Sequence, residues 1–191
     1  HRWAGPIRLS TLYGLRRSEL LALKWDDIDF DERTVRVDEA LIEVEGRPVW
    51  TEGKNERSRR TFAIDADTAE HLAAHRRLQD EERDLARDDW DEQNLVLATR
   101  TGNRVSPGNF DQTLDRLVRQ AGVPRLTSHG LRHTAATHMV RQATDLGELR
   151  AVADVLGHSP DMLMRTYAHA LPDSLRAVSD RIGGRVAGWD S

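Results

Sequence analysis

One stretch of the chain, residues 28–64, carries the alternation of apolar and polar side chains that is typical of β-strands. Within it TVRV alternates at 34–37, ALIEV follows at 40–44, EGRP has the composition of a turn, and RTFAI closes the stretch at 60–64. We expect the three strand segments to form one antiparallel sheet. Because most other patterned segments have helical spacing, the predicted fold class is mainly α with a small three-stranded antiparallel β-sheet (α+β).

Helical patterns lie on both sides of this stretch. RRSELLALK at 16–24 predicts a short helix with Leu20 and Leu23 facing inward. After the strands, a long helix is expected from about residue 67, where Asp67 and Glu70 resemble a capping box.

The second half of the chain is expected to be helical after a short extended segment, NLVLAT at 94–99. Ser106 followed by Pro107 is typical of a helix start, and Gly122 marks the expected end of that helix. Its apolar stripe is formed by Phe110, Leu114, Leu117, Val118 and Ala121. Further helices are expected at about 129–142, 147–155, 160–169 and 173–182.

Composition excludes some chemistry and leaves much open. A chain of 191 residues can bury the core of one domain, and because it begins at His1 we expect a fragment of something longer. We find no secretory signal and no apolar run of membrane-spanning length. The absence of cysteine excludes disulfides, thiolate metal sites and a cysteine nucleophile, and it permits a cytoplasmic location. The formal net charge of −4 gives no hint of nucleic acid.

The segment LTSHGLRHTAATHMV, residues 126–140, concentrates three histidines and an arginine on one expected helix. His129, Arg132 and His133 would share one face, whereas His138 would point elsewhere. One interpretation is a zinc site on the two histidines of an HxxxH pair. Zinc hydrolases of that spacing have a glutamate beside the first histidine, where this chain has Gly130, and Arg132 would repel the metal.

Two further interpretations of this helix remain. The histidines could be satisfied by backbone carbonyls beside a surface arginine. Alternatively, a guanidinium fork and imidazole N–H groups near a helix start could bind an oxyanion such as a phosphodiester.

Four segments together resemble the tyrosine recombinase (phage integrase) family, in the order in which that family has them. YGLRRSELLALKWDDID at 13–29 is similar to the first box, GKNERSRRTFAI at 53–64 to the lysine hairpin, HGLRHTAATHMV at 129–140 to the HxLRH box, and LGHSPDMLMRTYAHA at 156–170 to the last box. The matches span about residues 5 to 182. The resemblance implies a domain that cuts and rejoins DNA strands.

The resemblance implies a role for each matching residue. Tyr167 would be the nucleophile, and Arg16 and Arg132 would hold the non-bridging oxygens of the scissile phosphate. His129 and His158 would bond the same phosphate, with His129 also accepting the tyrosine proton.

The other matching residues would assist. Lys54 would protonate the leaving oxygen, Glu19 would orient the site without reacting, and His133 would support its helix from within. The family commonly has Lys-Thr in the hairpin, where this chain has Lys54-Asn55. No metal and no cofactor is expected.

The resemblance also implies partners and organisation. Double-stranded DNA attachment sites are the expected substrate, bound by a homotetramer with possible accessory bending or directionality factors, in the cytoplasm and with no membrane. Residues 1–191 would form the catalytic domain, without the helical core-binding domain that precedes it in the family. Residues 173–191 would form a C-terminal helix and tail exchanged between protomers, with a contact stripe of Leu175, Val178 and Ile182.

The chemistry can be argued from residue types as well. Metal-free cleavage of DNA needs a nucleophile, stabilisation of the phosphate charge and proton transfer. The chain has two tyrosines, and Tyr13 is expected to pack, which leaves Tyr167. Lys54 is one of two lysines among 28 cationic residues, and a lysine, unlike an arginine, can act as a general acid.

Three rival functions stay open at this point. A type IB topoisomerase shares the chemistry but relaxes supercoils. A DNA-binding regulator would use the fold without cutting, and a zinc hydrolase would use the histidine helix.

Overall fold

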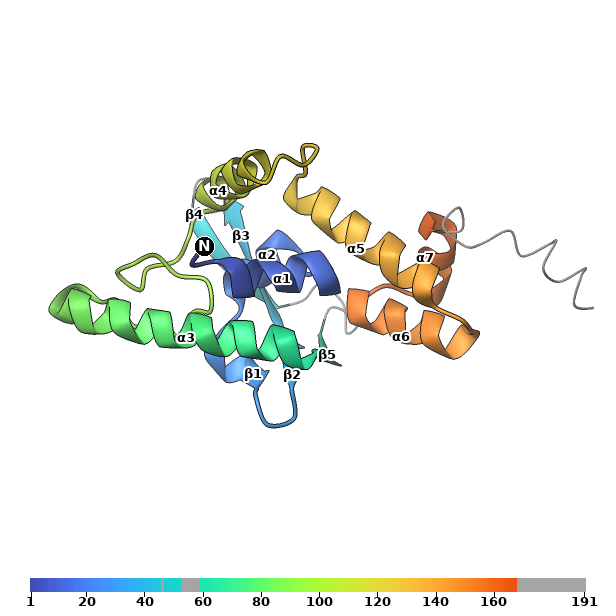
Figure 1. The fold of residues 1–191 in the computed structure, drawn as a ribbon, viewed down its shortest axis with the longest axis horizontal. Helices are drawn as coiled ribbons and strands as arrows, with labels where there is room; N and C mark the ends of the chain where they lie inside the picture. The colour runs from blue at the N-terminus through green and yellow to red at the C-terminus, as the bar shows by residue number, and fades with distance from the viewer. Residues whose placement is uncertain (46, 53–58, 168–191) are drawn as a thin grey trace, which may run out of the picture.

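Helix α1 (Ala4–Tyr13) lies at the centre of the fold, where it packs against α3 (Ala66–Ala86) and α5 (Ser128–Gln142) (Figure 1). The computed structural model describes residues 1–45, 47–52 and 59–167. The sequence patterns did not indicate α1, although its Leu9 is fully buried. Pro6 lies in the first turn of α1, where a missing N–H leaves no helical bond unmade.

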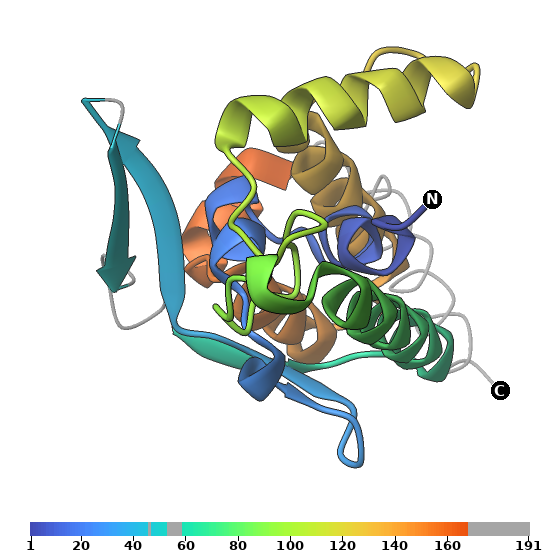
Figure 2. The ribbon, with the colours of Figure 1, turned by 90° about the vertical axis from the view of Figure 1, so that its left-hand side faces the viewer.

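The strands form two small sheets rather than the single sheet predicted. In the described residues, β1 (Ile28–Asp29), β2 (Thr34–Val37) and β5 (Arg60–Ala63) form one antiparallel sheet in the order β1-β2-β5. β3 (Glu39–Val44) pairs instead with β4 (Arg47–Glu52), as Figure 2 shows.

The prediction was wrong about the grouping of the strands and about EGRP. Its last two residues begin β4, and residues 40–44 do not pair with 60–64. Strand β4 was not predicted because it contains Pro48, and a proline cannot donate a hydrogen bond to a β-ladder and is typical of turns and sheet edges. β3 lies outside the first sheet and packs on α2 (Arg17–Ala22), with Leu41 buried in the core. The fold class itself, mainly helical with small antiparallel sheets, is confirmed.

The expected short helix and long helix are both present. Leu20 and Leu23 are buried, as predicted for 16–24. Helix α3 begins one residue before the predicted start, and the predicted capping box is wrong. The N-cap is Asp65, whose carboxylate accepts hydrogen bonds from the backbone N–H and hydroxyl of Thr68. Two short 3-10 turns complete this half, Trp25–Asp27 and Arg87–Asp89.

The remaining helices match their predicted spans to within two residues where they are described. They are α4 (Pro107–Gln120), α5, α6 (Leu146–Leu156) and α7 (Pro160–Tyr167). Ser106 caps α4 as predicted, but Ala121 is exposed and Leu117 only half-buried. The segment predicted to be extended, 94–99, forms no strand: Leu95 and Ala98 make isolated bridges, and the chain bends at Val96 and Leu97 between them. The predicted helix at 173–182 lies outside the described residues.

Two apolar clusters fill the interior. The larger unites α1, the sheets, α3 and α4, while the smaller joins α5, α6 and α7 and includes Leu156, Leu163 and Tyr167. Across the ranges given above, no helix has both the length and the apolar character needed to span a membrane.

Candidate active site

The polar side chains of helix α5 lie partly in the interior and partly on the surface. Thr127 caps the helix by accepting a hydrogen bond of 3.0 Å from the Gly130 N–H. Arg132 then points inward and is 5% exposed, whereas His129 and His133 are exposed. The expectation that His133 supports the helix from within is therefore wrong. Its Nδ1 lies 3.3 Å from the Thr137 hydroxyl on the helix surface.

Arg132 connects three segments that are distant in the sequence. Its Nη1 donates to the Gly14 carbonyl at 2.6 Å, and its Nη2 donates to the Leu156 carbonyl at 2.5 Å. The same Nη2 lies 2.8 Å from Nε2 of His158. Burial, followed by the nearby charge of Arg16, lowers the pKa of Arg132 to about 10, so it stays protonated at neutral pH.

His158 is positioned as an acceptor. It follows Gly157, whose φ of 62° ends α6, and its backbone N–H donates to Ala153. Because Arg132 can only donate, Nε2 of His158 must carry no proton, and the neutral ring then carries its proton on Nδ1. That Nδ1 is buried without a hydrogen-bond partner among the described residues. Burial, followed by the charges of Arg132 and Arg16, lowers the pKa of His158 to about 4.

Glu19 accepts hydrogen bonds from two arginines, Arg16 and Arg60. One carboxylate oxygen accepts from the Arg16 N–H at 2.8 Å and from Nη2 of Arg60 at 2.9 Å. The other accepts from Nη1 of Arg16 at 2.7 Å and from Nη1 of Arg60 at 3.0 Å. Burial alone would raise the pKa of Glu19, but its bonds and charge interactions with the two arginines outweigh burial and hold it at about 2.

Arg60 is the residue that the sequence analysis missed. Its side chain is 5% exposed, and its Nε donates to the Val155 carbonyl at 2.7 Å, so it joins β5 to α2 and α6. A signal was available, since strand alternation puts Arg60 on the same face as the buried Phe62 and Ile64.

The Glu19–Arg60 pair makes a testable contribution to stability. Glu19→Gln should lower the free energy of unfolding at pH 7 by about 3 kcal/mol, because it leaves a buried guanidinium without its counter-charge. The folded pKa of about 2 lies below the ordinary value of 4.5. The carboxylate therefore stabilises the fold above about pH 4.5, and this contribution is lost as the pH falls toward 2.

Urea unfolding of both proteins at pH 7 and pH 3 measures this effect, and the difference between them should shrink by roughly half at pH 3. Glu39→Gln is the matched control, because Glu39 pairs with Lys24 at the surface and should contribute less than about 1 kcal/mol. A Glu19→Gln effect that is equally large at both pH values would contradict the assigned pKa.

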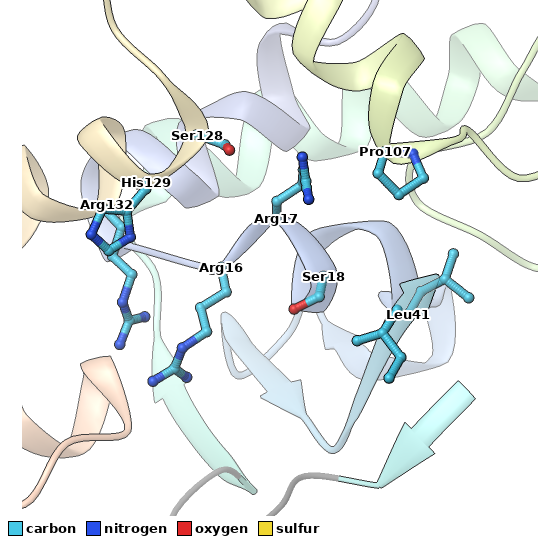
Figure 3. Close-up of a pocket in the computed structure, with 9 residues that line it drawn as sticks. Arg16, Arg17, Ser18, Leu41, Pro107, Ser128, His129 and Arg132 are labelled. Carbon is cyan, nitrogen blue, oxygen red and sulfur yellow. The ribbon is translucent and has the colours of Figure 1, made fainter. Parts of the chain in front are cut away.

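A cavity of about 520 Å³ opens beside these groups (Figure 3). One part of it is lined by Arg16, the N-cap residue of α2, and by His129 and Arg132 of α5. Three positive or hydrogen-bonding side chains around one space make it suited to an oxyanion.

Tyr167 ends α7 beside this group. Its side chain is 4% exposed, and its ring stacks on His158 with centroids 6.4 Å apart. The edge of the His133 ring lies 5.2 Å away between centroids. Among the described residues these are its ring contacts, and none is recorded with His129. Burial raises the pKa of Tyr167, and the charge of Arg132 opposes that shift.

Tyr13 has a different environment. Its hydroxyl bonds with the Asp65 carboxylate and accepts from the Asp65 N–H at 2.8 Å, and its ring stacks on Phe62. The prediction that Tyr13 packs is confirmed.

Most of the predicted site residues thus lie in one group, through side-chain contacts or, for His129, through the shared cavity: Arg16, Glu19, His129, Arg132, His133, His158 and Tyr167. Lys54 lies outside the described residues, as do Leu175, Val178 and Ile182. In the part of the chain that is described, no three His, Asp or Glu side chains gather as metal ligands would.

Comparison with solved structures supports this fold. The Tn1549 transposon integrase in complex with transposon right end DNA superposes with a TM-score of 0.76 at 22% identity, covering 95% of this chain and 59% of that one. The XerH site-specific recombinase bound to difH gives a TM-score of 0.60 at 23% identity, over 88% and 42% of the two chains. Likeness at this identity shows the fold alone.

Sequence comparison gives the family. The tyrosine recombinase XerC-like protein of Caldanaerobacter subterraneus is 31% identical over 185 residues, which cover 90% of this chain and 46% of the relative. The tyrosine recombinase XerC of Mycobacterium bovis is 34% identical over 181 residues, covering 94% and 53%. The chain therefore spans about half the length of the curated relatives it matches. Residues 3–173 match the Phage integrase family, and the chain belongs to that family.

Proposed function

We propose that the gene product carrying this chain is a site-specific DNA recombinase that cuts and rejoins strands through a 3′-phosphotyrosyl intermediate, without metal or ATP. The observation that carries the proposal is the contact of Tyr167 with His158, which in turn contacts the buried Arg132. The proposed nucleophile Tyr167, the imidazole of His158 and the cation of Arg132 are therefore adjacent. Arg132 also lines the cavity, together with Arg16 and His129.

In the proposed reaction the Tyr167 hydroxyl oxygen attacks phosphorus as the bond from phosphorus to the 5′-oxygen breaks. The tyrosine loses its proton to a base and the leaving oxygen gains one from an acid, for which His129 and Lys54 are the candidates. The ester bond is exchanged rather than hydrolysed, so the reverse attack by a 5′-hydroxyl rejoins the strand with no ATP.

The contacts of Arg132 constrain how it would hold the phosphate. Three of its five N–H donors are engaged by Gly14, Leu156 and His158, which leaves two for phosphate oxygens. For His158 to donate from Nε2 as well, it must release Arg132 and take up a proton there. The charge of a bound phosphate favours this, because it offsets the arginines that lower the pKa of His158.

A covalent complex formed in EDTA is the direct test. We expect the gene product, incubated in EDTA with sheared genomic DNA of its source organism, to form an adduct that survives SDS and is digested by protease. Sequencing the captured ends should give a defined site, as expected of a tetramer that exchanges strands between two attachment sites. Adduct formation that stops on chelation and returns with Mg²⁺ or Zn²⁺ would contradict the proposed mechanism.

Plasmids that carry two captured sites distinguish recombination from relaxation. Recombinant products are expected, whereas relaxation of supercoils without exchange would favour the topoisomerase function.

A further inference from the structure

The cavity that Arg16, His129 and Arg132 line extends to a third arginine, Arg17. Figure 3 shows the side chains of Arg16 and Arg17 diverging, with Arg17 directed between Ser128 and Pro107. Figure 3 shows the hydroxyl of Ser128 on the same side of the cavity as the Arg17 guanidinium, whereas the hydroxyl of Ser18, which also lines the cavity, points away from Arg17. A single phosphate would occupy only a small part of about 520 Å³.

Arg17 forms an ion pair between two helices. Its Nη1 contacts Oδ2 of Asp111, which joins α2 to α4, and this bond uses one of five N–H donors. The two side chains are 39% and 44% exposed, so water screens the pair and an incoming anion can share or replace the carboxylate. Asp111 therefore leaves the guanidinium available to a ligand.

The divergence of Arg16 and Arg17 within one cavity suits the repeated charges of one DNA strand. Because they are adjacent in the chain and diverge, their charged groups face two places in one cavity rather than one place. Consecutive phosphates of a strand rise by about 3.4 Å along the helix axis, so two neighbouring phosphates are the anions that such a pair would meet together.

We propose that Arg17, assisted by the hydroxyl of Ser128, binds a phosphate next to the scissile one on the same strand. This second phosphate subsite rests on the proposed function, since it takes its DNA from the site at Arg16 and Arg132. It would fix the register of the strand and so determine which phosphate meets Tyr167.

Methylphosphonate substitution tests the subsite, because it removes the charge of one chosen phosphate. Once the captured adduct has defined the scissile phosphate, duplexes carry a methylphosphonate at its 5′ or its 3′ neighbour. For the wild type, one of these two substitutions should weaken binding and slow adduct formation about tenfold, as expected for one partly exposed charged contact. Arg17→Ala should show the same tenfold loss on unmodified DNA and no further loss on that modified duplex.

Two further variants control for folding. Arg8→Ala removes an arginine that pairs with Asp67 away from the cavity, and it should retain the full methylphosphonate penalty. Asp111→Asn breaks the same ion pair as Arg17→Ala but leaves the guanidinium in place. We therefore expect it to bind unmodified DNA at least as tightly as the wild type, and the methylphosphonate should still weaken its binding and slow its adduct formation.

The outcomes separate this inference from the proposed function. Suppose that the wild type forms adduct, but that in Arg17→Ala a methylphosphonate at either neighbouring phosphate still weakens binding and slows adduct formation as it does in the wild type. Arg17 then only connects α2 to α4, and the proposed subsite is wrong. If Asp111→Asn loses the penalty together with Arg17→Ala, the ion pair and not the guanidinium matters, which also overturns it. If the wild type forms no adduct on any DNA, both proposals fail together.

Discussion

Tyr167→Phe should abolish the covalent protein–DNA complex while DNA binding stays at the wild-type level. The phenyl ring keeps the stacking on His158 and the packing in the cluster of α5, α6 and α7, so the fold should be retained. Only the hydroxyl oxygen is lost, and without it no phosphotyrosine can form. Adduct is measured on denaturing gels in EDTA, and binding by mobility shift on the captured site.

Tyr13→Phe is the matched control, because these are the only two tyrosines of the chain. It should form adduct like the wild type but unfold more easily, by about 1 kcal/mol, because the Asp65 that caps α3 loses a hydrogen-bond partner. Adduct that persists in Tyr167→Phe and disappears in Tyr13→Phe would reverse the assignment.

The environment of Tyr167 explains why the nucleophile would need help. Burial raises its pKa, so at neutral pH the hydroxyl carries its proton. Arg132 acts in the opposite direction, which means that the group proposed to hold the phosphate also favours the phenolate. A base is still required, and the ring contacts of Tyr167 with His158 and His133 show that imidazoles lie next to it.

Local signals were sufficient for most of the helices. Ser106 with Pro107 marked the start of α4, and Gly122 marked its end, because capping depends on residues within one turn. Helix α1 gave a weak signal, since Gly5 lowers the helix propensity of the segment. Its helix is stabilised by tertiary packing, with Gly5 close to the backbone of His71 on α3.

Strand pairing and the contacts of the site depended on distant residues. β2 pairs with β5 across the whole β3–β4 hairpin, a pairing that no local pattern records. Arg132 was predicted from its resemblance to a family box, but its bond to the Gly14 carbonyl joins residues 118 positions apart. Motif order could therefore predict which residues gather, whereas their burial and hydrogen bonds follow from the tertiary fold.

Lys54→Ala should slow cleavage of ordinary DNA by about 10²–10⁴-fold, if Lys54 is the general acid. This proposal rests on the sequence, because Lys54 lies outside the described residues. An alkoxide is a poor leaving group, so the 5′-oxygen needs a proton as its bond to phosphorus breaks. A sulfur atom at that bridging position leaves as a thiolate, which needs no proton at neutral pH.

Cleavage by Lys54→Ala should therefore return almost to the wild-type rate on a duplex with 5′-bridging sulfur at the scissile phosphate, measured as the single-turnover rate of adduct formation. Tyr167→Phe should not be restored, because the attacking oxygen is still missing. Arg16→Ala should recover only in part, since the sulfur substitution replaces a proton donor and not a cation that holds the phosphate. If Lys54→Ala is equally slow on both duplexes, Lys54 binds phosphate or shapes its hairpin, and the proton must come from another group.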